Sequence, residues 1–431
     1  MQEEKNLGYK ELVAIAVGGM VGGGIFTILG ISVSIVGSLA PFAIALGGLI
    51  AFFAAYAYVK LGVYYQDEGA TYAFFKRTYP DSHLAASFIG WYTLFGYIST
   101  LALYAYTFSS YSISGFAFAD SEIARKSVAI AILWIFTMIN LWSVKGMGKL
   151  EDTMVYTKLI ILLLISVALI YYGSTDLHTF MQTVSKDFAK SSTLNILIVS
   201  SVTFVAYEGF QLVINAVNEM ETPEKNIPKA IYTSVILVAL IYFIIAIGAV
   251  LAIPAEDLIK NKEYALASGA ADIMGDWGRN LVIIGAVLAT SSAISGTIFG
   301  SSRQMARISE DHYLPSLLSK RTQHIPTYAI LAMSSTASLL ILGGGLRLIL
   351  EFGSITFLLV SLLMALANFK IRAKTGSSTI FTLIAIAGLL TGTLLILYYE
   401  YMTQPEQLLY IIGLYLLLSI SAWLYARFAN R

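Results

Sequence analysis

The first apolar stretch of the chain contains the sequence Val17-Gly-Gly-Met-Val-Gly-Gly-Gly-Ile-Phe26. Five of the seven residues from 18 to 24 are glycine, and each costs roughly 1 kcal/mol relative to alanine in a helix interior. Close packing of two helices explains part of the pattern, because Gly18/Gly22 and Gly19/Gly23 have the GxxxG spacing. Three consecutive glycines exceed what a packing groove requires. We therefore predict that the backbone unwinds here, in the middle of a helix.

The composition around this stretch is that of a membrane protein. The chain has 431 residues, of which 57% are hydrophobic and 12% charged, whereas a soluble domain carries about 25% charged residues. Lipid must therefore solvate much of its surface. The net charge of +1 creates no basic field for nucleic acid, and the lack of cysteine excludes disulfides and thiolate chemistry. The four histidines lie near the ends of the predicted spans, so we expect neither a metal centre nor a cofactor.

Apolar stretches long enough to cross a bilayer recur along the whole chain. A transmembrane helix needs about 20 apolar residues. The first stretch, Leu12–Val59, is long enough for two crossings, and Ser38 and Pro41 predict a turn that divides it. The remaining stretches are Leu84–Ala119, Ser127–Val144, Thr153–Thr175, Ser191–Asn218, Ala230–Ala255, Asn280–Ser302, Thr322–Leu346, Phe352–Phe369, Thr375–Tyr399 and Gln407–Ala426. We predict an all-α integral membrane protein with about twelve transmembrane helices and no separate soluble domain.

The basic residues predict how these helices are oriented. Of the 27 lysines and arginines, eighteen fall in segments on the side of the N-terminus, eight fall on the other side, and Lys158 lies within a span. Lysine and arginine concentrate in cytoplasmic loops. We therefore expect a multi-pass protein of the cell membrane with both termini in the cytoplasm.

A second interruption is predicted in the sixth span, which contains Phe204-Val-Ala-Tyr-Glu-Gly-Phe-Gln211. Glu208 lies near the centre of this span, where a charged side chain costs at least about 2.5–3.5 kcal/mol. One reading is a structural, hydrogen-bonded carboxyl group. The other is a carboxylate that faces a wet cavity or a partner, and Gly209 beside it permits a break in the helix.

The two weakened helices, the first and the sixth, stand five spans apart. This is the pattern of two inverted five-helix repeats that each begin with a discontinuous helix. Irregular backbone at membrane depth is tolerated where it lines a cavity. The half-helix N-termini would carry unpaired N–H groups that suit a carboxylate, and the freed carbonyl groups would suit an ammonium group. Together the two ends predict a site for a zwitterion.

Lys158 lies about a turn and a half inside the fifth span and has two readings. A snorkelling lysine would extend its ammonium group back toward Glu151 and Asp152. A functional lysine would place its ammonium group within the bundle and load and release a proton there. The hydroxyl residues of the eighth span, Thr290-Ser-Ser292 with Ser295, either line the same space or serve close helix packing.

Four motifs in these positions resemble the amino acid–polyamine–organocation (APC) transporters. The sequence from Gly22 to Phe26 is similar to the break in their first helix, and Tyr207-Glu-Gly-Phe210 is similar to the break in their sixth helix. The segment Glu219–Ala230 resembles their loop into helix seven. Arg303-Gln-Met-Ala-Arg307, followed by Asp311 and Leu314-Pro315, resembles the segment after their helix eight. The motifs extend from helix one to helix eight, and we identify the chain as a member of this family.

The resemblance implies a LeuT-type fold in a single transporter domain over residues 1–431. The inverted repeats would span about 12–175 and 191–370, and two peripheral helices about 375–428. Amide groups around Gly22, Gly23 and Gly24 would hold the carboxylate of the substrate. Carbonyl groups of Met20, Val205, Ala206 and Glu208, beside Gly209, would hold its amino group. Gly18, Val21, Ser291 and Ser292 would surround the position of the second sodium ion in sodium-coupled relatives. In some proton-coupled members a lysine of helix five fills that position, and Lys158 resembles this lysine.

Two departures from the family pattern concern the substrate. The family often has an apolar residue at the position of Glu208, so its carboxylate would select cationic substrates or carry a second proton. Gly23 stands where a serine is frequent, which removes one side-chain contact with the carboxylate of the substrate. We expect a secondary transporter of amino acids that works by alternating access and proton symport in a lipid bilayer, and the alternative is an amine or polyamine exchanger.

Two other classes of protein are disfavoured. An intramembrane enzyme would need a catalytic or metal-binding constellation at membrane depth, and one carboxylate does not provide it. We therefore expect no catalytic residues. A channel would need a charged ring or a filter-like repeat, and the sequence contains neither.

Overall fold

The computed structural model describes residues 7–142, 147–173, 176–261, 263–322 and 325–428. These residues form helices and connecting segments and contain no β-strand beyond two isolated bridges. The longer helices are α1 (Tyr9–Met20), α2 (Gly24–Val36), α3 (Ala40–Tyr65), α5 (His83–Ser112), α6 (Glu122–Trp142), α7 (Met147–Tyr172), α8 (Leu177–Lys190), α9 (Thr193–Val202), α11 (Pro223–Ala252), α13 (Ala265–Glu310), α14 (Thr327–Gly343), α15 (Leu346–Lys370), α17 (Thr379–Thr403) and α18 (Pro405–Phe428). The shorter helices are α4 (Ala70–Thr78), α10 (Leu212–Asn215), α12 (Ala255–Lys260) and α16 (Arg372–Thr375).

Nine helical segments within the described residues are long and apolar enough to cross a membrane. Their hydropathy and number make the chain a multi-pass membrane protein. The predicted division of the first stretch is confirmed, because a 3-10 turn at Gly37–Leu39 separates α2 from α3 and Pro41 lies in the first turn of α3. The predicted fourth and ninth spans correspond to α6 and to α14, a shorter apolar helix. The count of about twelve spans stays a prediction.

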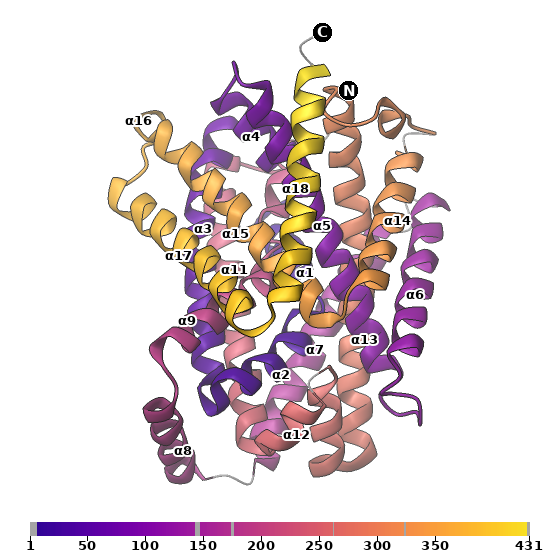
Figure 1. Cartoon of the computed structure of the whole chain (residues 1–431), viewed down its shortest axis with the longest axis vertical. Coiled ribbons are helices and arrows are strands. Elements are labelled where there is room, and N and C mark those ends of the chain that lie inside the picture. Colours follow the sequence, from indigo (N-terminus) through magenta and orange to yellow (C-terminus); the bar gives the residue numbers. More distant parts are fainter. Residues whose placement is uncertain (1–6, 143–146, 174–175, 262, 323–324, 429–431) are drawn as a thin grey trace.

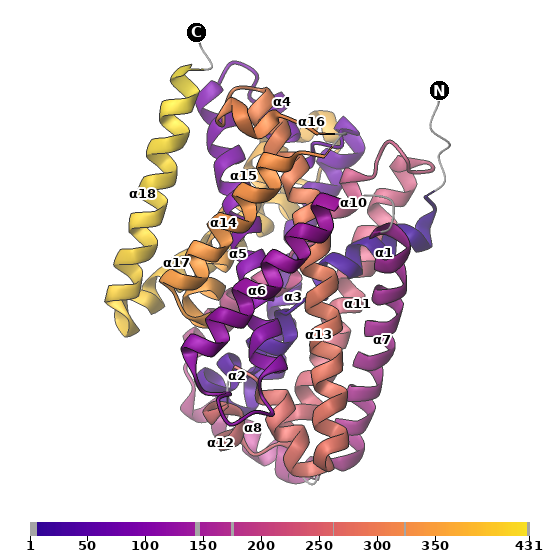
Figure 2. The same cartoon turned by 90° about the vertical axis from the view of Figure 1, so that its right-hand side faces the viewer.

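The helices pack into a bundle in which the two interrupted helices lie inside (Figure 1). The most hydrophobic windows of α15 and of the segment Thr193–Asn215 are each 83% buried. Those of α17 and α18 are only 33% and 17% buried, and α18 lies at the edge of the molecule in Figure 2. The last two helices are therefore peripheral, whereas the segment with the second interruption is enclosed by the rest of the bundle.

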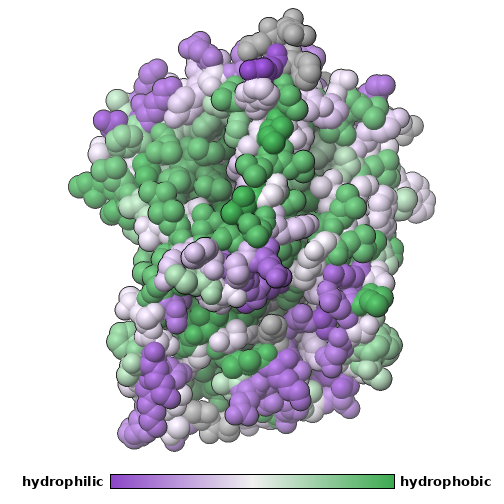
Figure 3. All heavy atoms as spheres, in the orientation of Figure 1, coloured by the Kyte–Doolittle hydropathy of each residue, from purple (hydrophilic) through white to green (hydrophobic). Residues whose placement is uncertain are grey.

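The exposed surface over α15, α17 and α18 is broadly apolar, and hydrophilic residues gather toward its upper and lower edges (Figure 3). Large exposed side chains on α17 and α18 include Ile380, Phe381, Leu394, Leu409, Leu416 and Ile420. A soluble monomer rarely exposes an apolar area of this extent. Lipid is the solvent that such a surface requires.

One helix is much longer than a bilayer requires. α13 runs from Ala265 to Glu310, and its backbone departs from helical geometry at Gly275, where φ is 66°. Glycine adopts this left-handed conformation without the steric penalty that a side chain would bring. The predicted eighth span, Asn280–Ser302, lies within the long part of α13 that follows this kink.

Candidate functional site

The predicted break in the first span is confirmed. α1 ends at Met20 and α2 begins at Gly24, so residues 21–23 turn the chain between two half-helices. The N–H groups of Gly23, Gly24, Ile25 and Phe26 form no hydrogen bond with the described residues, and the first bond of this turn runs from Thr27 N to Gly23 O, at 3.1 Å. These groups are the unpaired donors that every helix N-terminus leaves, and they attract a negative group.

The predicted break in the sixth span is also confirmed. α9 ends at Val202, and a 3-10 turn follows from Thr203 to Tyr207. Glu208 has extended backbone geometry and Gly209 has a φ of 126°, before α10 begins at Leu212. The left-handed value explains the glycine at position 209, since other residues rarely adopt it.

The two breaks lie directly against each other. A Cβ atom on Gly209 would lie 2.5 Å from the carbonyl carbon of Gly19, and one on Gly24 would lie 2.7 Å from Cβ of Ala206. The residues predicted around a substrate therefore occupy one place, although they come from segments about 190 residues apart in the sequence. The glycines are required by this close approach of two backbones.

Tyr242 of α11 joins the two breaks. Its hydroxyl donates to Met20 O at 2.9 Å and lies 3.1 Å from Ala206 O, and its side chain is fully buried. Gly22 N also donates to Met20 O, at 3.0 Å, and Glu208 N donates to Val205 O, at 3.2 Å. Three of the carbonyl groups expected to hold an amino group thus already accept bonds from the protein itself. The carbonyl group of Glu208 accepts none from the described residues.

Residues of α5 form another wall of the site. The hydroxyl of Tyr104 donates to Gly19 O at 3.3 Å, and a Cβ atom on Gly22 would lie 2.7 Å from its ring. The hydroxyls of Thr107 and Thr27 lie 2.7 Å apart, and Thr107 packs against Gly23. A side chain at either glycine would collide with α5.

The ammonium group of Lys158, on α7, reaches the first break. Its Nζ donates to Gly18 O at 2.8 Å and to Val21 O at 2.7 Å, and the residue is fully buried. These carbonyl groups lie at the C-terminal end of α1, where the helix dipole favours a cation. The ammonium group therefore faces the bundle interior rather than snorkelling, and the side chains of Glu151 and Asp152 lie outside the described residues.

The predicted serines of α13, like Lys158, lie next to the first break. Ser291 and Ser292 are both buried, and Cβ of the next residue, Ala293, would lie 2.8 Å from a Cβ atom on Gly22. α13 also packs along α7, which carries Lys158. The structure therefore brings the serines, the break and α7 together.

The carboxyl group of Glu208 is buried and only partly paired. Gln211 Nε2 donates to its Oε2 at 3.0 Å, and the hydroxyl of Ser361 on α15 lies close to the carboxyl group, whereas Oε1 forms no hydrogen bond of good geometry with the described residues. Tyr58 of α3 and Tyr97 of α5 face it from neighbouring helices. A buried oxygen without a donor is costly, so this atom is suited to a proton or to a cationic ligand.

Sequence reasoning missed Tyr242, Tyr104 and Thr107. Tyr242 is one polar group in an otherwise apolar stretch, whereas Tyr104 and Thr107 lie in a stretch with many other hydroxyl residues, from which nothing in the sequence distinguishes them. The signal for Tyr242 was its position within a long apolar helix, where its hydroxyl needs a partner. No group of three or more potential metal ligands occurs in the part of the chain that the structure describes.

Comparison with known proteins shows the family to which the chain belongs. A family profile described as "Amino acid permease" matches residues 7–408. An uncharacterized protein of Methanocaldococcus jannaschii is 30% identical over 410 residues, which cover 93% of this chain and 91% of that protein. The inner membrane transport protein YbaT of Escherichia coli is 28% identical over 432 residues, covering 98% and 97% of the two chains. The branched-chain amino acid permease BcaP of Bacillus subtilis is 24% identical over 382 residues, covering 83% and 80%. The profile matches nearly the whole chain, and this multi-pass membrane protein therefore belongs to the amino acid permease family.

Proposed function

We propose that this protein is a secondary active transporter that moves an amino acid by sodium-independent proton symport. The observation that carries the proposal is the buried ammonium group of Lys158, which binds two carbonyl groups at the end of α1. Its positive charge occupies the position where a sodium ion would sit and disfavours a second cation there. Relatives named as amino acid permease and as transport protein support the class of substrate and the activity.

The substrate would bind between the two breaks. Its carboxylate would accept hydrogen bonds from the N–H groups of Gly23 and Gly24, which the protein leaves unpaired. Its ammonium group would lie near the carbonyl groups of Ala206 and Glu208. The side chain of the substrate would extend toward α5, where Thr107 and Tyr104 limit the size of this side chain.

Loss of the proton would change the contact between α7 and α1. A charge-assisted hydrogen bond contributes about 1.5–3 kcal/mol, roughly twice a neutral one. When Lys158 releases its proton to water on the cytoplasmic side, its bonds to Gly18 and Val21 weaken and α1 is freed to move. This bias toward an inward-open state would couple proton release to substrate release.

The overall topology that accompanies this proposal is the LeuT-type arrangement. We infer about twelve spans, with inverted repeats over about 12–175 and 191–370. The positive-inside distribution of basic residues supports a cell-membrane protein with both termini in the cytoplasm. The interruptions observed in the first and sixth spans, which stand five spans apart, support two repeats that each begin with a broken helix.

The decisive experiment measures uptake of a labelled amino acid mixture into proteoliposomes without sodium, with and without an inward proton gradient. We expect the gradient to stimulate uptake by the native protein and not by Lys158→Ala. Exchange of internal for external substrate, which needs no gradient, would show that the variant is folded. The matched control is Lys186→Ala, an exposed lysine on α8. Equal stimulation of native protein and Lys158→Ala would show that Lys158 does not couple transport to protons.

A second candidate function is the exchange of cationic amines. The unpaired Oε1 of Glu208 favours it, because a carboxylate beside the break would bind a second ammonium group. Uptake that requires amines preloaded inside the vesicle, and that Glu208→Gln abolishes, would support exchange. Glu219→Gln, which changes an exposed carboxylate, is the control.

A further inference from the structure

A second buried group of charges lies outside the site described above, where α15 begins and α17 ends. Arg347 Nε donates to Glu351 Oε1 at 2.7 Å, and Arg347 Nη2 lies 3.7 Å from Glu400 Oε1. The carboxyl groups of Glu351 and Glu400 lie within hydrogen-bonding reach of each other. Gln407 of α18 donates to the other oxygen of Glu351. Three successive long helices, α15, α17 and α18, therefore meet at this cluster.

The charges of the cluster do not balance if both carboxyl groups are ionised. Glu351 and Glu400 are 1% and 0% exposed, and one guanidinium group serves both of them. Both oxygens of Glu400 lack a hydrogen-bond donor among the described residues. Two carboxyl groups that lie within hydrogen-bonding reach of each other in a medium of low dielectric constant cannot both be ionised without a large electrostatic cost. A single proton between them removes one negative charge and supplies the missing hydrogen bond.

Among the described residues that line the adjoining cavity, Arg347 is the one basic residue. Tyr399 places its ring 5.1 Å from the guanidinium carbon of Arg347. Glu263 belongs to the segment before α13 and pairs with Arg125 of α6. From α2 the nearest polar side chain is the neutral Ser34, and from α18 it is the neutral Gln407. The described groups around the pair therefore leave the negative charge in excess.

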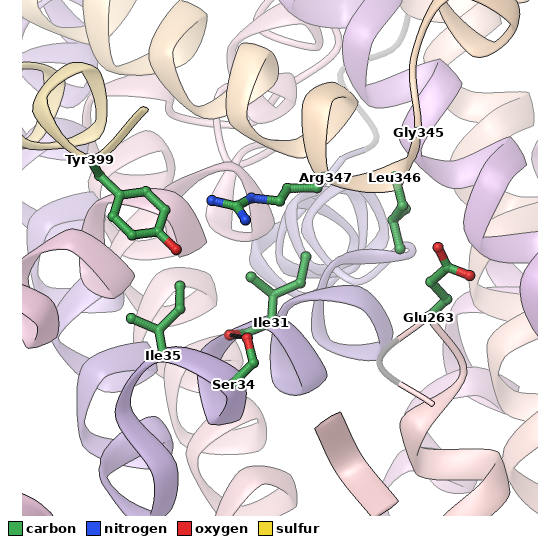
Figure 4. Close-up of a pocket in the computed structure, with 8 residues that line it drawn as sticks. All are labelled: Ile31, Ser34, Ile35, Glu263, Gly345, Leu346, Arg347 and Tyr399. Carbon is green, nitrogen blue, oxygen red and sulfur yellow. Dashed lines mark hydrogen bonds between the residues drawn. The ribbon is translucent and has the colours of Figure 1, made fainter. Parts of the chain in front are cut away.

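A cavity of about 140 Å³ lies between Arg347 of this cluster and α2, the helix that follows the first break, and neither Glu351 nor Glu400 lines it. Its lining includes Ile31, Ser34 and Ile35 of α2, together with Arg347 and Tyr399. Figure 4 shows Arg347 extending from α15 toward Tyr399, on the side of the cavity opposite α2. The cavity provides space for water to deliver or remove a proton. The guanidinium group of Arg347 lies across the cavity from α2. A movement of this group, when the carboxyl pair gains or loses a proton, would therefore change the cavity next to α2.

We propose that Glu351 and Glu400 form a proton-binding site separate from Lys158, which holds one proton between the two carboxyl groups. Arg347 compensates the remaining negative charge. When the proton leaves, the second carboxylate draws Arg347 away from Tyr399 and toward the pair. The shape of the cavity wall next to α2 would therefore depend on the proton concentration on the side of the membrane where the cavity lies.

Infrared difference spectroscopy of the purified protein tests the shared proton without any transport. The native protein at neutral pH should show a carbonyl band of a protonated carboxylic acid that disappears in both Glu351→Gln and Glu400→Gln. Glu406→Gln, an exposed carboxylate at the start of α18, should leave the band unchanged. Any band of Glu208 is common to all of these proteins, so the comparison concerns only a band that a variant loses relative to the native protein. Spectra in which neither buried variant loses a band, or in which Glu406→Gln loses the same band, would overturn the proposal.

Thermal unfolding supplies a second readout for the same variants. A native state that holds one proton more than the unfolded chain loses stability as the pH rises. The melting temperature of the native protein should therefore fall as the pH rises above the range in which a free glutamate side chain titrates, and this fall should be smaller in Glu400→Gln. Equal slopes for native protein and Glu400→Gln would contradict the shared proton. Neither readout depends on symport, so these results are independent of the test of Lys158.

Discussion

Gly209 packs its α-carbon against the backbone of Gly19, so closely that a Cβ atom at position 209 would lie 2.5 Å from the carbonyl carbon of Gly19 and 2.7 Å from Met20 N. This contact holds the two interrupted helices together without any side chain. The φ of 126° at Gly209 adds a conformational reason for glycine at the same position. Both constraints act on the place where we propose that the substrate binds.

The first prediction concerns this contact. Gly209→Ala should destabilise the protein by more than the about 1–3 kcal/mol that a strained backbone conformation alone costs, because the methyl group also collides with Gly19. Thermal unfolding in detergent and initial rates of uptake would measure the loss. Gly388→Ala in α17 is the control, since a Cβ atom there meets nothing within 4 Å. An equal effect of the two substitutions would contradict this account.

The second prediction concerns the close approach of Gly24 and Ala206. Gly24→Ala should abolish uptake, because its methyl group would lie 2.7 Å from Cβ of Ala206 and would push the N–H groups of α2 away from the substrate. Ala206→Gly removes that atom. The double variant should therefore recover part of the uptake, with the remaining loss due to the contact of 3.0 Å with the α-carbon of residue 206. A double variant as inactive as Gly24→Ala would place the defect elsewhere.

The third prediction concerns the hydroxyl group of Tyr242. Tyr242→Phe should lower stability by about 1–3 kcal/mol, since it leaves Ala206 O without its donor in the protein interior. It should also alter the KM of transport, because the freed carbonyl group of Ala206 faces the proposed ammonium site. Tyr232→Phe, on the same helix, removes a hydroxyl for which the described residues show no hydrogen bond and serves as the control.

The fourth prediction concerns the ion pair between Arg125 and Glu263. The guanidinium group is 5% exposed and also donates to Ala119 O, so it links α6 to the segment before α13. Arg125→Met should destabilise the protein by about 1–3 kcal/mol, below the cost of breaking a fully buried pair because Glu263 is partly exposed. Arg125→Met combined with Glu263→Gln should recover part of this loss in thermal unfolding. A strictly additive double variant would show that the pair is not coupled.

The breaks in the first and sixth spans could be predicted from sequence because glycine disfavours helix strongly and locally. Three glycines at positions 22–24 and a glutamate at position 208 are unusual in a lipid-facing helix, so each indicates an interruption by itself. The turn at Ser38 and Pro41 was predictable for the same reason. These features depend on short stretches of sequence and on the solvent alone.

The partners across the bundle could not be predicted in this way. Arg347 and Glu351 stand four residues apart and face each other on one helix turn, which the sequence allows one to expect. Glu400 joins them from another helix, and only the packing of α17 against α15 brings it there. Tyr242 likewise finds Met20 at a separation of 222 residues. Contacts of this kind depend on helix packing, for which one sequence contains no direct signal.

The hydrogen bonds that Lys158 and Tyr242 donate to the first break also constrain the order of events while the protein is synthesised. Val21 leaves the ribosome 137 residues before Lys158, and Met20 leaves it 222 residues before Tyr242. At about 5–20 residues per second, the first of these delays lasts roughly 7–30 s. An unpaired carbonyl group in hydrocarbon costs several kcal/mol, so α1 cannot settle in lipid during that time. We therefore expect membrane insertion of the first helix to finish late, after α7 and α11 have been synthesised. Until then, water or the insertion machinery would have to form hydrogen bonds with the carbonyl groups at the end of α1.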